Sequence, residues 1–218
     1  MPTDLVCWRV CEALNAYVAG LREVFDDELA GVYLCGSVAG GAYDPAVNDV
    51  DVAVLHRPDL SGEQRRALAR LHEDLENHYA AAARLDVSFV LLRLVGTYGD
   101  DNLPYYREGR FHPVGGDVNA VLWHTLRERG LILWGPPAAE FVAPVSGGEL
   151  AENVCRNLAF LSRRMPDYVR SGTRYSGCSA SADAYTPCAP GRYSERPRPP
   201  VGRSAKWIPP GGRSSPAP

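Results

Sequence analysis

The fold is decided by residues 31–55, which begin Gly31-Val-Tyr-Leu-Cys35-Gly36-Ser37 and end, after a loop, in Asp49-Val50-Asp51-Val-Ala-Val-Leu55. Both apolar runs are short and rich in β-branched residues, which is typical of strands. The turn Gly36-Ser37 follows the first run directly. Glycine lets a phosphate approach the backbone closely, so this turn is a candidate anion site, although a Gly-Ser pair alone is more often a simple tight turn.

Asp49 and Asp51 open the second run. Side chains alternate between the two faces of a strand, so these carboxylates are expected to point the same way, a few ångströms apart. Their charges repel unless a cation lies between them, and oxygen ligands of this kind suit Mg²⁺. The alternative is a solvent-facing strand with two ordinary acids. Because Val50 and Val52 indicate a buried strand, we favour the metal site.

Asp86 is the only acid in a third apolar run, residues 85–92. A lone carboxylate in a buried strand is costly unless it is paired with a cation or bound to a metal ion. Placed beside the strand of Asp49 and Asp51, it completes a cluster of three carboxylates. The alternative is that Asp86 stands at the exposed start of its strand.

The remaining sequence predicts helices and strands in mixed order, which favours an α+β (α/β-like) domain with a mixed β-sheet flanked by helices. Apolar residues at helical spacing predict the helices, and a short apolar run predicts a further strand. The helices cover residues 4–25, 61 onward, 118–129 and 148–164, and the strand covers 131–134. Pro166 is expected to end or interrupt the last helix, because proline lacks the backbone N–H.

Residues 98–113 are predicted to form a loop, with a short strand over 105–111. The loop carries Arg107 and Arg110. They are candidates for phosphate contact, but we interpret them as solvated surface groups.

The end of the chain differs in composition from the rest. Residues 176–218 hold nine of the 18 prolines, no leucine, and six basic against two acidic residues. Such a segment buries too little apolar surface to offset the entropy of ordering, so we expect a disordered tail. The first 175 residues carry a net charge of −7, from 17 basic and 24 acidic side chains. We divide the chain into a catalytic domain (1–146), a remnant of a helical domain (147–175) and the tail.

Composition also excludes several classes of protein. No apolar run approaches the ~20 residues of a membrane span, and the first residues lack a signal-peptide pattern, so we expect a cytoplasmic protein. No pair of the six cysteines has metal-ligand spacing, which argues against a zinc site. The acidic body has no basic stripe, which argues against nucleic-acid binding and suits a small cationic partner.

The order of the polar residues resembles a known signature. Gly36-Ser37, a Gly-rich loop, Asn48-Asp49-Val50-Asp51 and an acid in a third strand look like the nucleotidyltransferase superfamily. The later helix, apolar strand and Gly135-Pro136-Pro137 resemble the aminoglycoside adenylyltransferases that act on streptomycin and spectinomycin. The resemblance spans residues 6–164.

This resemblance implies transfer of AMP from ATP to a hydroxyl group of an aminoglycoside-type antibiotic, with Mg²⁺ and release of pyrophosphate. By resemblance, Gly36 and Ser37 hold the triphosphate, and Asp49 and Asp51 bind the metal ion. Asp86 is the third carboxylate, either a metal ligand or the base that takes the proton from the substrate hydroxyl.

Two positions depart from the antibiotic-modifying relatives. Asn48, which we assign with Gly36 and Ser37 to the nucleotide site, stands where those relatives carry serine; it keeps a hydrogen-bonding group but not the hydroxyl. Asp86 stands where they carry glutamate and is one methylene shorter, which shortens the reach of a base.

The acceptor side is predicted to be incomplete. In the resembling family a helical C-terminal domain helps to close the antibiotic cleft with acidic groups, whereas here the expected helices stop near residue 175. We interpret the tail as the product of a frameshift that truncates this domain, with a natural disordered tail as the alternative. We expect a monomer, with association possible through the uncovered apolar helix face formed by Leu150, Val154, Leu158 and Leu161.

Three functions therefore remain open. The first is an antibiotic adenylyltransferase impaired by the loss of its C-terminal domain. The second is a nucleotidyltransferase of toxin–antitoxin type, which transfers AMP to a protein partner. The third is an inactive nucleotide-binding remnant.

Overall fold

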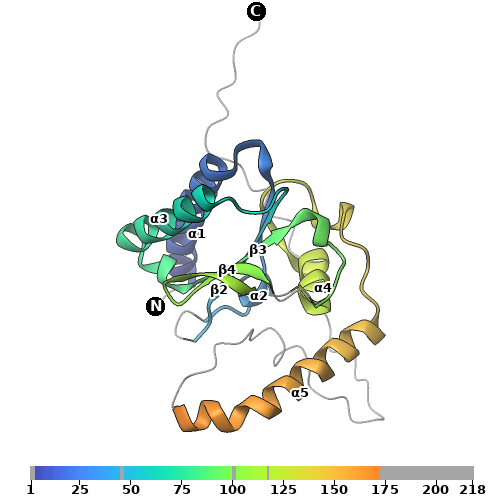
Figure 1. The fold of residues 1–218 in the computed structure, drawn as a ribbon. Helices are drawn as coiled ribbons and strands as arrows, with labels where there is room; N and C mark the ends of the chain where they lie inside the picture. Colours follow the sequence, from blue (N-terminus) through green and yellow to red (C-terminus); the bar gives the residue numbers. More distant parts are fainter. Residues whose placement is uncertain (1–2, 45–46, 100–101, 117, 172–218) are drawn as a thin grey trace, which may run out of the picture. The chain divides into compact units, whose positions relative to one another are not determined.

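The computed structural model describes residues 3–44, 47–99, 102–116 and 118–171. These residues build one six-stranded sheet in the order β5-β4-β3-β2-β1-β6, with helices packed against it (Figure 1). The predicted tail, its disorder and its origin in a frameshift concern residues 176–218, which lie outside the described residues.

The sheet is mixed, as the sequence predicts. Strand β2 (Val50–His56) lies parallel to β3 (Leu85–Leu91) and antiparallel to β1 (Leu29–Leu34). Strand β6 (Leu131–Trp134) pairs antiparallel with β1 and forms one edge of the sheet. The parallel register sets Asp51 directly opposite Asp86, so the central strand pair brings two of the predicted site residues together.

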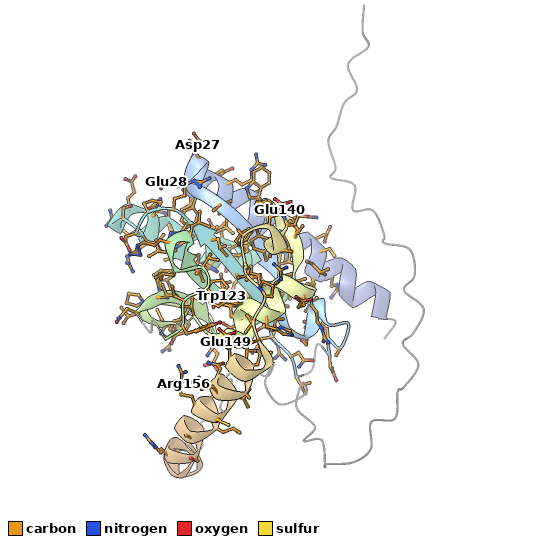
Figure 2. All side chains as sticks on the ribbon, turned by 90° about the vertical axis from the view of Figure 1, so that its right-hand side faces the viewer. Asp27, Glu28, Trp123, Glu140, Glu149 and Arg156 are labelled. Atoms are coloured by element: carbon orange, nitrogen blue, oxygen red, sulfur yellow. The ribbon has the colours of Figure 1, made fainter. Side chains whose placement is uncertain are left out.

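Helices cover both faces of this sheet. Helices α1 (Thr3–Phe25) and α3 (Gly62–His78) lie on one face, and α4 (Ala120–Arg129) lies on the other (Figure 1). Trp123 of α4 is buried in the core between this helix and the sheet, and its Nε1 donates to the Thr97 carbonyl at 2.7 Å (Figure 2). The shorter helical elements are α2 (Gly36–Ala39), η1 (Asp26–Glu28), η2 (Ala80–Arg84), η3 (Leu92–Leu94) and η4 (Ala138–Glu140).

Side-chain alternation decides which residues face α4. In β2, Ala53 and Leu55 pack in the core with Trp123, whereas Val52 and Val54 pack in the core with α1 and α3. Asp51 stands two residues before Ala53 and therefore shares the α4 face. By the same alternation Asp86 shares that face, because Val90, four residues on, belongs to the core beneath α4.

The prediction of a loop over residues 98–113 with one short strand over 105–111 is wrong, because two strands joined by a tight turn stand there. Strand β4 (Leu103–Arg107) pairs with β3, and β5 (Arg110–Gly116) pairs with β4. Glu108 and Gly109 join them with φ values of 50° and 72°, the positive values that a two-residue hairpin turn requires. Prolines at 104 and 113 obscured the pattern; they are tolerated at an irregular register and in the edge strand.

The last helix is longer than predicted. Helix α5 runs over Gly147–Ser171, so Pro166 does not end it. A proline removes one hydrogen bond of the helix, and the bonds on either side of it are sufficient to continue the helix here. On its apolar face Leu158 is 59% exposed, whereas Leu150 and Val154 are half-buried. No helix in the described part of the chain is long and apolar enough to cross a membrane.

Candidate active site

The Gly36-Ser37 turn follows the end of β1. Gly36 has φ +61°, and a Cβ atom built on it would lie 1.8 Å from Oδ2 of Asp51. The backbone amide of Cys35 donates to the carbonyl of Asp51 at 2.8 Å. Only glycine allows this close approach with this backbone conformation, so the turn and Asp51 of β2 form one unit.

Ser37 carries an orphaned hydroxyl. Its Oγ is buried and has no hydrogen-bond partner among the described residues. A buried hydroxyl without a partner is unfavourable and usually marks a missing ligand, ion or water. The sequence predicts Ser37 as a nucleotide-binding residue, and this orphaned hydroxyl is what a bound anion would satisfy.

Asp51 and Asp86 are adjacent carboxylates that line the same cavity. Burial, followed by the charges of Asp86 and Asp49, raises the pKa of Asp51 to about 7, and the charge of Arg107 opposes this rise. In the described structure Asp51 forms no ion pair. A half-buried acid in this state is a favourable place for a cation, because a cation would offset both its burial and its repulsion by Asp86.

Asp86, by contrast, already has a counter-ion. It is 8% exposed, and Arg107 donates to its Oδ2 from Nε and Nη2, both at 2.7 Å. Burial raises the pKa of Asp86, and the Arg107 guanidinium opposes this rise. The interpretation of Arg107 as a solvated surface group is therefore wrong: the guanidinium lines the cavity and pairs with the buried acid. The alternative of an exposed Asp86 is wrong as well.

The other three predicted residues, Ser37, Asn48 and Asp49, are not among the residues that line the cavity. Asp49 precedes β2 and pairs with Arg84 at 3.6 Å. Asn48 stabilises the preceding loop, where its Oδ1 accepts from the amide of Asp44 at 2.8 Å. In the described residues no three His, Cys, Asp or Glu side chains are grouped so that they hold a metal ion by themselves. The structure thus brings Asp51 and Asp86 together, with Asp49 near enough to affect their pKa values.

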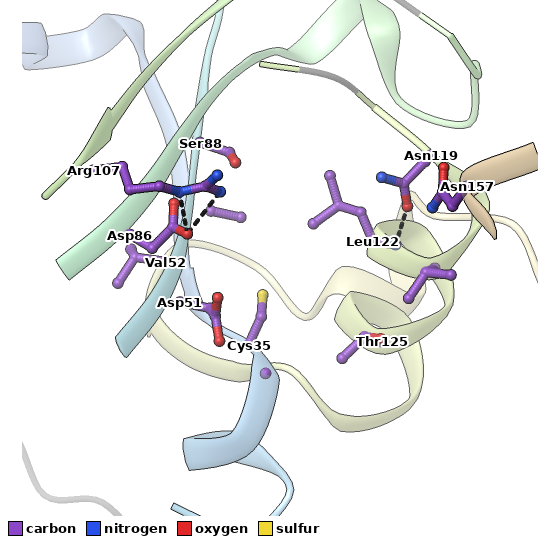
Figure 3. A pocket seen from close by; sticks show the side chains of 13 residues that line it. Cys35, Asp51, Val52, Asp86, Ser88, Arg107, Asn119, Leu122, Thr125 and Asn157 are labelled. Atoms are coloured by element: carbon purple, nitrogen blue, oxygen red, sulfur yellow. Dashed lines mark hydrogen bonds and ion pairs between the residues drawn. The ribbon is translucent and has the colours of Figure 1, made fainter. Parts of the chain in front are cut away.

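The cavity lies between the sheet and the helices α4 and α5 (Figure 3). About 680 Å³ of it is free of protein atoms, and this volume includes space that is open to solvent. Figure 3 shows Asn119, Leu122, Thr125 and Asn157 across the cavity from the carboxylates, and Val121 also lines the cavity. Asn119 caps α4 by accepting from the amide of Leu122 at 2.9 Å. None of these wall residues was predicted, and none of the described residues of this wall is charged.

Comparisons with known proteins show which family the first part of the chain is similar to. Residues 18–90 match the nucleotidyltransferase domain family. This match confirms the resemblance to the nucleotidyltransferase superfamily that Gly36-Ser37 and the paired acids predict. The matched segment includes Asp51 and Asp86 but ends before Arg107.

Three solved structures are similar to this chain, and the first of them shares its fold. The spectinomycin adenyltransferase AAD(9) of Enterococcus faecialis, solved with ATP and spectinomycin, has a TM-score of 0.55 and 14% identity, over 73% of this chain and 71% of that one. A toxin–antitoxin structure with AMP-PNP has a TM-score of 0.36 and 20% identity, over 73% of this chain and 98% of that one. A tri-AMPylated HEPN toxin of Shewanella oneidensis with its MNT antitoxin has a TM-score of 0.32 and 19% identity, over 75% and 99%. No curated protein matches the chain in sequence.

Proposed function

We propose that the chain transfers AMP from ATP to a hydroxyl group of an acceptor molecule in the cytoplasm. One observation carries the proposal: Gly36, Asp51 and Asp86 meet at a cavity beside the orphaned hydroxyl of Ser37. In this reaction the acceptor oxygen bonds to the α-phosphorus of ATP and pyrophosphate leaves. Such a transfer needs mainly positioning and neutralisation of charge.

Each residue has a role in this proposal. The Gly36-Ser37 turn holds the triphosphate through its backbone and the Ser37 hydroxyl. Asp51, whose charge has no ion-pair partner in the described structure, and the neighbouring Asp49 are suited to hold Mg²⁺. When bound, Mg²⁺ neutralises charge on the phosphates and on the departing pyrophosphate. Asp86 takes the proton of the acceptor hydroxyl or contributes a further ligand.

The acceptor we propose first is an aminoglycoside-type antibiotic of the streptomycin and spectinomycin class. The expected resemblance and the shared fold of a spectinomycin adenyltransferase support it. The negative charge of residues 1–175 also suits a cationic acceptor. The described wall of the cavity, however, is built from the uncharged Asn119, Thr125 and Asn157. This observation favours an uncharged hydroxyl acceptor, such as a side chain of a protein partner, as the second candidate.

The test measures pyrophosphate released from ATP and Mg²⁺ with streptomycin or spectinomycin present. Release that depends on the drug supports the first acceptor. Transfer of label from α-labelled ATP to a protein in a lysate supports the second. A double replacement of Asp49 and Asp51 by asparagine is the control, and activity that survives it would refute the metal site. If AMP is transferred to neither acceptor, the result supports the third alternative, an inactive nucleotide-binding remnant.

Ser37→Ala is expected to weaken ATP binding without destabilising the fold. A hydrogen bond to a charged group contributes about 1.5–3 kcal/mol, so the Kd for ATP should rise by roughly 10-fold or more. The free energy of unfolding should not fall, because the wild-type hydroxyl is buried without a partner. Isothermal calorimetry and thermal unfolding measure the two effects.

Ser61→Ala is the matched control for this variant. Its Oγ accepts from the amide of Gln64 at 3.1 Å and caps α3. Removing an N-cap costs about 1 kcal/mol of stability. We expect Ser61→Ala to unfold more easily and to bind ATP normally. An unchanged ATP affinity in Ser37→Ala would contradict the assignment of Ser37 to the phosphates.

A further inference from the structure

In the ion pair between Arg107 and Asp86, the guanidinium binds only one of the two carboxylate oxygens. Nε and Nη2 of Arg107 both donate to the same atom, Oδ2 of Asp86, at 2.7 Å. Figure 3 shows the guanidinium lying against this oxygen at the cavity, next to Ser88. Two donors on one oxygen hold the carboxylate in one orientation, and neither of these bonds uses Oδ1.

The β4–β5 hairpin holds Arg107 in place. Arg107 is the last residue of β4 and pairs with Arg110 across the turn. Its neighbour Tyr106 is anchored in the opposite core, where its ring stacks on buried His72 at 3.7 Å and its hydroxyl donates to Glu76. On the cavity face, the guanidinium lies 5.5 Å from the ring of Tyr105. The packing of the β4–β5 hairpin therefore fixes the position of the Arg107 guanidinium at the cavity.

Charge also distinguishes Arg107 from its surroundings. It is the one cation among the described residues that line the cavity, which include the two acids Asp51 and Asp86. Its side chain is 32% exposed, whereas that of Asp86 is 8% exposed. Removing the guanidinium would leave a buried carboxylate without a counter-ion and next to another acid, which is strongly unfavourable.

We propose that Arg107 is a positioning residue for AMP transfer: it holds Asp86 in one rotamer through Oδ2, so that Oδ1 faces the acceptor hydroxyl. This inference rests on the proposed function and adds a residue to it that lies outside the segment matching the family. Arg107 acts through Asp86 and does not itself bind the triphosphate. The alternative role for a cation at this place is direct contact with the phosphates, and the two roles make different predictions.

The experiment compares Arg107→Gln and Arg107→Lys with the wild type. Turnover is measured by pyrophosphate release with the active acceptor, and binding of ATP with Mg²⁺ is measured separately by calorimetry. Partners that orient a carboxylate at such sites typically contribute about 10- to 100-fold to activity, so kcat of Arg107→Gln should fall by that factor. The Kd for ATP should stay at the wild-type value. Arg107→Lys, which keeps the charge but not the two-donor fork, should give an intermediate kcat.

Arg93→Gln is a matched control, and a double-mutant cycle gives a second measurement of the interaction between Arg107 and Asp86. Arg93→Gln removes an ion pair of similar length, Arg93 to Asp59 at 3.1 Å, but both side chains are exposed (57% and 77%), so activity should not change. The double variant Asp86→Asn/Arg107→Gln removes both charges. A double-mutant cycle on thermal unfolding should then give an interaction energy between the two positions, because the stability lost in Arg107→Gln comes from the unpaired acid.

The outcomes separate cleanly. If Arg107→Gln and Arg107→Lys keep the wild-type kcat, or if the Kd for ATP rises in step with the loss of activity, the positioning role is refuted. If Arg107→Gln does not fold, Arg107→Lys decides by the same two measurements. A wild type that transfers AMP to no acceptor refutes the proposed function, and this inference with it. An active wild type with unaffected Arg107 variants refutes this inference alone.

Discussion

Asp51→Asn is expected to abolish most of the AMP transfer while the protein remains folded. Asp51 is the cavity acid without an ion-pair partner in the described structure, and asparagine keeps its shape but removes the charge that would hold Mg²⁺. Removing one electrostatic group of a preorganised site lowers kcat by roughly 100- to 1,000-fold. Pyrophosphate release with ATP and Mg²⁺ measures the loss. Asp59→Asn, which removes an exposed carboxylate, is the matched control and should be fully active.

The same variant should be more stable than the wild type when no metal is present. The ordinary pKa of an aspartate is 3.8, and burial and neighbouring acids raise that of Asp51 to about 7. The folded state therefore binds this proton more tightly than the unfolded state. This tighter proton binding contributes fully to the free energy of unfolding below about pH 4, and the contribution is lost as the pH rises through about 7. Asparagine does not titrate, so the Tm of Asp51→Asn should increasingly exceed that of the wild type as the pH rises over this range.

Thermal unfolding in a chelating buffer at pH 4, 6 and 8 checks this result. At pH 8 the Tm of Asp51→Asn should exceed that of the wild type, and at pH 4 the two should be equal. Adding Mg²⁺ at pH 8 should raise the Tm of the wild type alone, because a cation bound to Asp51 replaces the missing counter-charge. Equal Tm values at every pH, together with full activity, would mean that Asp51 is an ordinary exposed acid.

Patterns among residues close together in the sequence predicted the individual strands and helices. The apolar runs around Val52 and Val87 predicted the central strands, and the spacing of the apolar residues predicted α1, α3 and α4. Asp51 was assigned to the site because strand alternation is a short-range rule. The same rule placed Asp49 beside it in the cavity, but β2 begins at Val50, so Asp49 lies in the preceding loop and pairs with Arg84. The start of a strand is not readable from periodicity alone.

The residues that were missed are those whose partners are distant in sequence. Arg107 meets Asp86 across 21 positions, and only the β3–β4 pairing brings them together. Two prolines hid that pairing. Asn119, the N-cap of α4, and Asn157 of α5 line the cavity, and nothing in their local sequence marks them as site residues. One signal was present for Arg107: a buried acid needs a counter-ion, and Arg107 is among the first cations after that strand.

Gly36→Ala is expected to disrupt the site and the fold together. The new Cβ atom would lie 1.8 Å from Oδ2 of Asp51 and 2.6 Å from its Cγ, far inside any real contact. Either the carboxylate leaves its position opposite Asp86 or the turn after β1 opens. A misplacement of about 1 Å at a reacting centre costs roughly 100-fold in rate, and we expect a loss of kcat/KM of at least this size. Pyrophosphate release and thermal unfolding of the same preparation record both effects.

Gly96→Ala separates the close contact from the backbone conformation. Gly96 has φ +77°, similar to the +61° of Gly36, but a Cβ atom built on it meets nothing within 4 Å. A left-handed conformation costs a residue other than glycine about 1–2 kcal/mol, so Gly96→Ala should lose this much stability and no activity. Gly36→Ala should lose more stability and nearly all activity. If the two variants behaved alike, the requirement at position 36 would be the φ angle alone, and the contact between the turn and Asp51 would have no part in the site.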